Sequence, residues 1–236
     1  MTITSTTLGR VAGLAAVAAG VLFAVVQINH PPMEVASVHT TEWVVRNSMK
    51  TVMAGLALAG FTGMYLRQVR RAGVLGLVGY LLLAIGYLTM LAITFVAAYI
   101  VPALAESAPR YVDDILAVAA GGTANGDVGL FTAANQVSGF GYLVGGLLFG
   151  IALFRARVLA RWAAGLLAAG TVATALLPVL PYAVHRLFAL PTAVALIGLG
   201  LSLWRDQRTV TRASKAPLAV SIASAAPAPA EQATVR

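Results

Sequence analysis

Six apolar stretches dominate the sequence, and the gaps between them alternate between basic and acidic. Hydrophobic residues make up 59% of the 236 residues and charged residues only 10%, whereas a soluble domain carries about 25% charged residues. Because a surface this poor in charge cannot face water, we expect the chain to lie in a lipid bilayer. Long apolar segments cross a bilayer as helices, which satisfy their own backbone hydrogen bonds. The expected fold class is therefore all-α.

Each stretch approaches the roughly 20 residues that a helix needs to cross the hydrocarbon core. The third is long enough to tilt, and the sixth is slightly short. We predict a transmembrane domain of six helices over residues 1–205. A tail rich in Ala, Pro and Ser follows over residues 206–236 and is predicted to be disordered. The predicted spans are Arg10–Asn29, Arg46–Leu66, Val74–Val101, Val128–Phe154, Trp162–Leu180 and Leu187–Trp204.

The basic residues indicate which side of the membrane each gap faces, because short loops rich in Lys and Arg stay in the cytoplasm. With the N-terminus inside, twelve of the sixteen basic residues are cytoplasmic and six of the eight acids are outside. An even number of spans places both termini in the cytoplasm. We therefore expect a multi-pass protein of the cell membrane. The four outer basic residues are Arg46, Lys50, Arg110 and Arg186.

The net charge of +8 does not indicate nucleic-acid binding. Cytoplasmic anchors at the helix ends explain the excess, and no basic face alternates with aromatic residues as a nucleic-acid groove requires. The chain has no Cys, which excludes disulfides and thiolate chemistry. It also has no P-loop, no G-x-S-x-G and no HExxH-type motif. We therefore expect no cofactor and no nucleic-acid partner, with the lipid bilayer as the main partner.

The second span begins with polar residues. Its charge-free part, Thr51–Leu66, has only 16 residues, so the helix must take in Lys50 and reach toward Arg46. Spacings of three, four and four residues place His39, Glu42, Arg46 and Lys50 along one helical stripe, with Asn47 beside it. Ionisable groups at membrane depth usually face a partner or a wet cavity. The stripe therefore predicts one wall of a polar pocket near the outer leaflet.

A second interpretation of the same residues needs no pocket. The first two turns of the helix would stand outside the hydrocarbon, and Lys50 would extend toward water. Glu42 and Arg46 would then form an i,i+4 pair worth about 0.3–0.5 kcal/mol.

The fourth span supplies possible partners for the pocket. Asn135 and Gln136 are amides inside an apolar helix, where unpaired polar groups are costly, so we expect them to face other helices. The same span contains Gly141-x-x-x-Gly145 and Gly146-x-x-x-Gly150. Small residues at this spacing allow close helix packing. We expect packing within the monomer, and a homo-oligomer seam is the alternative.

Two functions are compatible with these residues. In the first, the pocket binds an amphiphilic, lipophilic small molecule or a partner helix. In the second, the chain is a membrane-embedded enzyme on a lipophilic substrate, such as a terpene cyclase, with Glu42 as a desolvated proton donor. The low aromatic content of 8% argues against a cyclase, which holds carbocations against aromatic faces. The predicted ligand-binding residues are His39, Arg46, Asn47, Lys50, Asn135 and Gln136.

All three histidines, His30, His39 and His185, fall in predicted outer segments together with most of the acids. These residue types bind zinc when three or four of them converge. The spacing His39-x-x-Glu42 suits two ligands on one helix but is common by chance. We therefore assign no metal from the sequence.

Three stretches carry a recognisable pattern: LGRVAGLAAVAAGVLFAVVQINHPP at residues 8–32, then GLALAGFTGMYLRQVRRAGVLGLVGYLLLAIG at 55–86, and VPALAESAPRYVD at 101–113. Together with Trp43 before the second span, they resemble a family of actinobacterial integral membrane proteins with no assigned activity. The resemblance covers roughly residues 8–205 and implies a multi-helix membrane domain. The chain departs from the family pattern after Trp43, where Arg46, Asn47 and Lys50 replace an apolar or small stretch. A role of the family therefore does not transfer simply to this chain.

Overall fold

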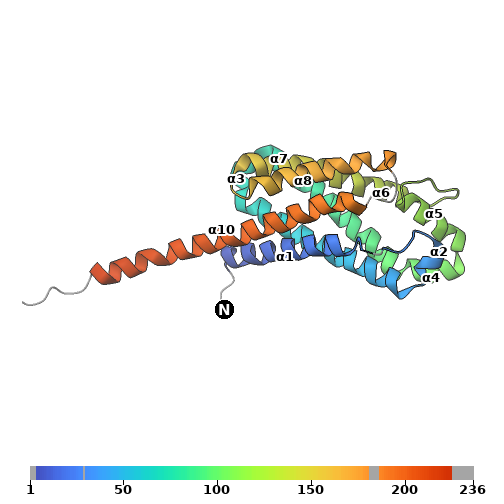
Figure 1. Cartoon of the computed structure of the whole chain (residues 1–236), viewed down its shortest axis with the longest axis horizontal. Coiled ribbons are helices and arrows are strands. Elements are labelled where there is room, and N and C mark those ends of the chain that lie inside the picture. The colour runs from blue at the N-terminus through green and yellow to red at the C-terminus, as the bar shows by residue number, and fades with distance from the viewer. Residues whose placement is uncertain (1–3, 29, 181–185, 225–236) are drawn as a thin grey trace, which may run out of the picture.

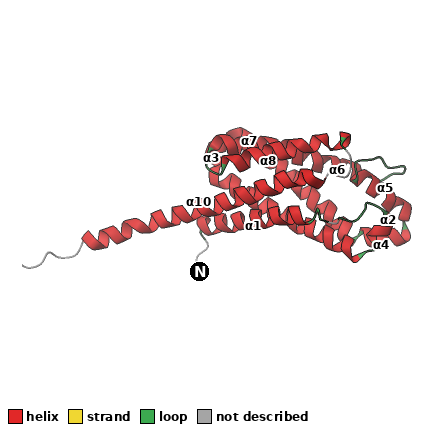
Figure 2. Ribbon diagram, in the orientation of Figure 1, coloured by secondary structure: helices red, strands yellow, loops and turns green. Residues whose placement is uncertain are grey.

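The computed structural model of the chain describes residues 4–28, 30–180 and 186–224. Every regular element within these ranges is a helix, as Figure 2 shows. The prediction of an all-α fold is confirmed.

Four helices in the described ranges are long and apolar enough to cross a membrane. A shorter apolar helix, Arg161–Leu177, follows the third of them; it joins α8 (Arg161–Ala173) to the first residues of η2 (Thr174–Val179). The four are α1 (Ser5–Val25), α3 (Thr41–Tyr99), the run of α6 (Phe131–Phe140), η1 (Gly141–Gly145) and α7 (Gly146–Ala156), and Arg186–Gln207, which joins η3 (Arg186–Phe188) to the start of α10 (Ala189–Ser224).

The longest helix, α3, folds back on itself. Its backbone leaves helical geometry at Gln68 (φ −133°, ψ 22°) and at Gly73 (φ 60°, ψ −162°), and a positive φ is readily adopted by glycine. The two halves then run antiparallel. The Trp43 indole Nε1 donates to the carbonyl oxygen of Ala97 at 2.8 Å, and the Thr62 and Tyr80 hydroxyls lie 2.9 Å apart. The predicted second and third spans are thus the two arms of α3.

The glycine spacings in the fourth predicted span are used inside the monomer. A Cβ on Gly141 would lie 2.7 Å from the Leu82 carbonyl oxygen of α3, and Gly145 meets the same arm at Leu83. Gly146 and Gly150 face α8 instead. Because two helices approach these glycines closely from different sides, larger residues there would push the bundle apart. A homo-oligomer remains a prediction from the sequence.

The bundle has two different ends (Figure 1). Three short helices, α2 (Val35–Val38), α4 (Val101–Ser107) and α5 (Pro109–Ala119), gather at one end, which we call the capped end. The start of α1, the turn of α3 and the loop between α7 and α8 lie at the other end (Figure 1). We call this the arginine-rich end, because five arginines lie in or next to the turn and the loop: Arg67, Arg70, Arg71, Arg155 and Arg157.

The helix bounds differ from the predicted spans most at the starts of the first and second spans and at the end of the sixth. The first helix begins at Ser5, ahead of the predicted Arg10, because the Thr4 side chain caps it by accepting from Thr7 N at 3.2 Å. The last helix, α10, continues to Ser224, past residue 206, where the sequence predicts the disordered tail to begin. Residues 225–236 of that tail lie outside the described ranges, and the division into two domains stays a prediction.

Candidate functional site

The polar stripe predicted along the second span is shorter in the structure. The α3 helix begins at Thr41, and its N-cap Thr40 accepts a hydrogen bond from Trp43 N at 3.2 Å. His39 is exposed and ends the short helix α2. It therefore lies on a different element, and the stripe on α3 consists of Glu42, Arg46 and Lys50 only.

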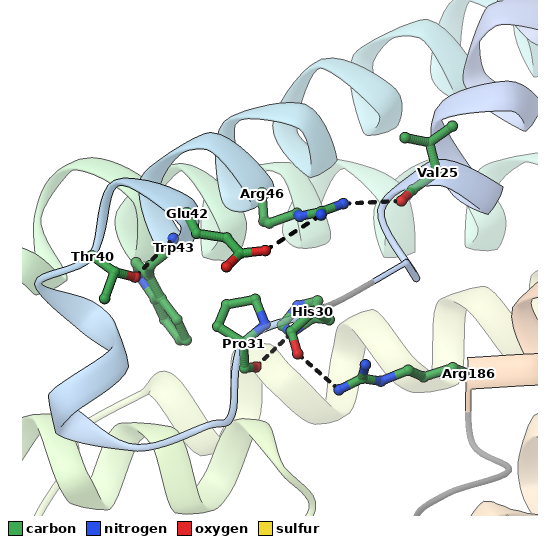
Figure 3. A network of polar contacts seen from close by, with 8 residues as sticks. All are labelled: Val25, His30, Pro31, Thr40, Glu42, Trp43, Arg46 and Arg186. Carbon is green, nitrogen blue, oxygen red and sulfur yellow. Dashed lines mark hydrogen bonds and ion pairs between the residues drawn. The ribbon is translucent and has the colours of Figure 1, made fainter.

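Glu42 and Arg46 form a surface ion pair at the start of α3 (Figure 3). The Arg46 Nη2 and Glu42 Oε1 atoms are 3.4 Å apart, and the Glu42 side chain is 51% exposed. Arg46 also donates through Nη1 to the carbonyl oxygen of Val25 at 3.1 Å. This carbonyl lies at the end of α1 and also accepts from Ile28 N at 3.1 Å. Arg46 thus ties α1 to α3, and Glu42 holds Arg46 without being buried.

Lys50 points in a different direction and contacts the segment that follows α1. Its Nζ donates to the His30 ring nitrogen Nε2, while His30 Nδ1 lies 2.8 Å from the Pro31 carbonyl oxygen and donates to it. This places the ring proton on Nδ1. Burial, and next the charge of Lys50, lower the pKa of His30 from 6.5 to about 4. The imidazole is therefore neutral at neutral pH and accepts from Lys50.

Arg186, at the start of η3, fixes the same segment from the opposite side. Its Nη2 donates to the His30 carbonyl oxygen at 2.9 Å (Figure 3). Arg46 and Arg186 thus bind the backbone on either side of the His30 side chain, and both belong to the basic residues predicted outside. The positive charges of Lys50, Arg186 and Arg46 all act on His30.

A cavity of about 170 Å³ lies beside Lys50, between the two arms of α3, helix α5 and helix α6. Asn47 is 4% exposed and donates to the Trp43 carbonyl oxygen at 3.0 Å. Across the cavity, Asn135 donates to the Val118 carbonyl oxygen at 3.2 Å. The polar lining residues are Asn47, Lys50, Thr94 and Asn135, and the apolar ones include Ile93, Ile115, Leu116, Ala119 and Phe131.

The structure thus brings together three of the predicted ligand-binding residues: Asn47, Lys50 and Asn135. Gln136 lines a separate apolar groove with Leu82 and Phe140. Neighbouring residues of a helix point about 100° apart, and here Asn135 lines the cavity while Gln136 lines the groove. His39, Glu42 and Arg46 are not among the residues that line the cavity.

Two residues behind the site, His30 and Arg186, were not among the predicted ligand-binding residues. His30 was placed on the outer side by the sequence, but its contact with Lys50 joins residues 20 positions apart. Arg186 contacts His30 across 156 positions. Neither separation leaves a periodic signal, so only the packing of α1, α3 and η3 reveals these contacts.

The cavity combines positive charge with an apolar wall. Lys50 forms no ion pair with a carboxylate in the described part of the chain, unlike Arg46, which pairs with Glu42, and Arg67, which pairs with Asp206. The described residues contain no group of three or more His, Asp or Glu side chains that could hold a metal ion, and His185 lies outside them. Lys50 is partly buried, an ammonium without a counter-ion is costly there, and an anionic ligand would offset that cost. Glu42 is exposed and lies outside the cavity, so no acid at this site matches the cyclase hypothesis.

No protein-family model matches the chain, and neither a curated protein nor a solved structure is similar to it.

Proposed function

We propose that this chain is a multi-pass membrane protein whose capped end faces outward and binds a small amphiphilic anion beside Lys50. The observation that carries the proposal is the cavity of about 170 Å³, where Lys50 lies without a carboxylate partner opposite apolar side chains. The ligand's acidic group would contact Lys50 and the amides of Asn47 and Asn135. Its apolar part would pack against Ile115 and Phe131.

Six spans with both termini in the cytoplasm agree best with the helices and their charges. The two arms of α3 count as two spans, and the shorter helix formed by α8 and η2 adds one to the other three. The turn of α3 and the loop between α7 and α8 lie at one end (Figure 1), and five arginines lie in or next to them: Arg67, Arg70, Arg71, Arg155 and Arg157. Short basic loops stay cytoplasmic, which directs the capped end outward.

The size of the cavity favours a small molecule over the other occupants. A cavity of about 150 Å³ holds benzene, so about 170 Å³ accommodates a compact aromatic or short-chain acid. A partner helix is about 10 Å wide and does not fit. An isoprenoid chain several times larger than benzene also exceeds this volume, which is a second reason to prefer binding over cyclisation.

The proposal is tested with benzoate as the anionic probe and benzyl alcohol as its neutral counterpart. Calorimetric titration of the full chain in detergent micelles compares wild type with Lys50→Met, which keeps an unbranched apolar side chain and removes the charge. Because a hydrogen bond to a charged group contributes about 1.5–3 kcal/mol, benzoate affinity should fall roughly tenfold or more. Benzyl alcohol affinity should change little, and Glu42→Gln should leave both affinities unchanged.

A second variant covers the case in which Lys50→Met does not fold. Ala119→Leu adds apolar volume inside the cavity without touching its charge and should weaken benzoate and benzyl alcohol together. The proposal is wrong if benzoate binds Lys50→Met as it binds wild type. It is also wrong if Ala119→Leu leaves both affinities unchanged.

A further inference from the structure

Two adjoining cavities at the arginine-rich end differ sharply in chemistry. One has a volume of about 510 Å³ and is lined by four arginines, Arg67, Arg70, Arg71 and Arg157, and by one acid, Asp206. The other, of about 700 Å³, is a mostly apolar groove between the first turns of α1 and the first arm of α3. Leu66 and Arg67 line both, so the basic cavity and the groove adjoin at these residues.

The single acid is already used by one arginine. Arg67 contacts Asp206 through two nitrogens, Nε with Oδ2 and Nη2 with Oδ1, the latter at 3.1 Å. This bidentate pair joins the turn of α3 to α10 at the border between the two cavities. Arg70, Arg71 and Arg157 are exposed and form no ion pair within the described part of the chain. Three guanidinium groups therefore face the basic cavity without a carboxylate partner.

Besides the positive charge, two local features distinguish the basic cavity. Among the described residues, Arg157 is the one non-glycine residue with a positive φ, 56°, a conformation that glycine adopts at lower cost. Gln68 is 3% exposed and lines the basic cavity, and its Oε1 has no hydrogen-bond partner. A buried unpaired acceptor costs free energy. A ligand with a hydroxyl donor would satisfy this acceptor once the Gln68 side chain rotates toward the cavity.

We propose that these cavities hold one anionic phospholipid with a hydroxylated headgroup, such as phosphatidylglycerol, drawn from the cytoplasmic leaflet. Its phosphate meets Arg70, Arg71 and Arg157, because guanidinium groups bind phosphate oxygens in a bidentate manner. A headgroup hydroxyl donates to Gln68 Oε1. One acyl chain lies in the groove, against Ala12 and Ala59.

The groove is what distinguishes a lipid from a free anion. Its rim includes Leu8, Val11 and Leu66, which are 60%, 59% and 64% exposed. Apolar side chains with this much exposed surface are suited to contact lipid acyl chains. Soluble phosphate would use only the basic cavity and leave these apolar surfaces uncovered. A phospholipid covers both surfaces at once, and anionic lipids are attracted to basic residues at the cytoplasmic membrane surface.

The test measures lipid retention by the full chain in detergent, using native mass spectrometry with phosphatidylglycerol and phosphatidylcholine offered in equal amounts. Wild type should retain phosphatidylglycerol in preference. Each arginine removed should weaken retention roughly fivefold, because a basic residue near an anionic surface contributes about 1 kcal/mol. The variants are Arg157→Gly and the double change Arg70→Gln with Arg71→Gln.

Matched variants separate lipid binding from folding. Glycine suits the backbone at position 157, so Arg157→Gly should not lower the Tm while it weakens lipid retention. Arg155→Gln removes the same charge from an exposed residue outside both cavities and should retain the lipid as wild type does. Equal losses in Arg155→Gln and Arg157→Gly would overturn the proposal, because a general charge effect would then explain retention. Equal retention of the two lipids by wild type would overturn it as well.

A third variant addresses the groove. Ala59 is exposed and lines it, so Ala59→Phe places a ring where the acyl chain is proposed to lie. Phosphatidylglycerol retention should fall, while binding of inorganic phosphate, measured by calorimetry, should stay as in wild type. If Ala59→Phe retains the lipid fully and inorganic phosphate alone responds to the arginine variants, the site binds free anions and the lipid proposal is wrong.

Discussion

The two ends of the bundle use positive charge in different ways. At the capped end, one ammonium, Lys50, lies beside a cavity of about 170 Å³ together with two amides whose hydrogen bonds to the backbone hold them in place. At the arginine-rich end, exposed guanidinium groups surround about 510 Å³. A lysine is a compact point charge, whereas arginines present planar forks that bind phosphate. This difference underlies the two proposals, in which the first end binds a small anion and the second end binds one anionic phospholipid.

The comparison depends first on the two ends facing opposite sides of the membrane, and this gives the largest expected effect. The chain contains no Cys, so single cysteines can be placed without background. Ser107→Cys lies on α4 at the capped end and Arg155→Cys on α7 at the other, and both positions are exposed. A membrane-impermeant maleimide applied to intact cells should label Ser107→Cys and leave Arg155→Cys unlabelled.

The control for this experiment is permeabilised cells, in which both cysteines should react. Labelling of Arg155→Cys alone in intact cells would invert the orientation and place the Lys50 cavity at the cytoplasmic side. Labelling of both would contradict a membrane between the two ends.

Much of this two-ended arrangement could be predicted from the sequence, because it depends on local patterns. Apolar length indicates the spans, and the alternation of Arg with acids indicates the ends. The amide Asn135 and the pair Asn47 and Lys50 were predicted to form a pocket, and they line one cavity. The turn within α3 follows Arg67 and ends at Gly73, where the sequence predicts a gap between spans.

The missed contacts all join distant parts of the chain. Asp206 lies 139 positions from Arg67, and Arg186 reaches His30 across 156. Such pairs depend on which helix packs beside which, and no spacing within one helix contains that information. The stripe was also predicted to include His39. The periodicity alone does not reveal that Thr40 is the N-cap of α3 and that the helix begins at Thr41, after His39.

The next prediction tests whether the charge at the capped end is held by a neutral partner. His30 has a pKa of about 4 in the folded protein, below its ordinary 6.5. As the pH falls, the unfolded chain therefore takes up a proton at His30 before the folded chain does. The contribution of neutral His30 to the free energy of unfolding is fully present above pH 6.5 and is lost as the pH falls from 6.5 toward 4. This pKa difference corresponds to about 3 kcal/mol, which solvent screening of a partly exposed side chain reduces to about 1–2 kcal/mol.

The measurement is the Tm of the detergent-solubilised chain between pH 7 and pH 5, compared with His30→Gln. Glutamine does not titrate and still offers an oxygen to the Lys50 Nζ, so its Tm should vary less over this range. Carboxylates that titrate at lower pH affect both proteins alike and cancel in the difference. Parallel losses of Tm in wild type and His30→Gln would show that His30 is not the group that couples acidification to unfolding.

The smallest expected effect concerns the two ion pairs, one at each end of the bundle. Arg67 and Asp206 join distant helices through two contacts, and both side chains are partly buried. Glu42 and Arg46 lie one turn apart on α3, with Glu42 half exposed. Exposed i,i+4 pairs contribute about 0.3–0.5 kcal/mol, whereas bidentate geometry strengthens a pair. Asp206→Asn should therefore lower the free energy of unfolding by about 1 kcal/mol and Glu42→Gln by less than about 0.5 kcal/mol.

Both are neutral amide replacements of a carboxylate, so the difference between their Tm values isolates pair geometry from side-chain size. If Glu42→Gln costs as much as Asp206→Asn, Arg46 needs its carboxylate in order to hold the end of α1. The capped end would then depend on paired charge as much as the arginine-rich end does.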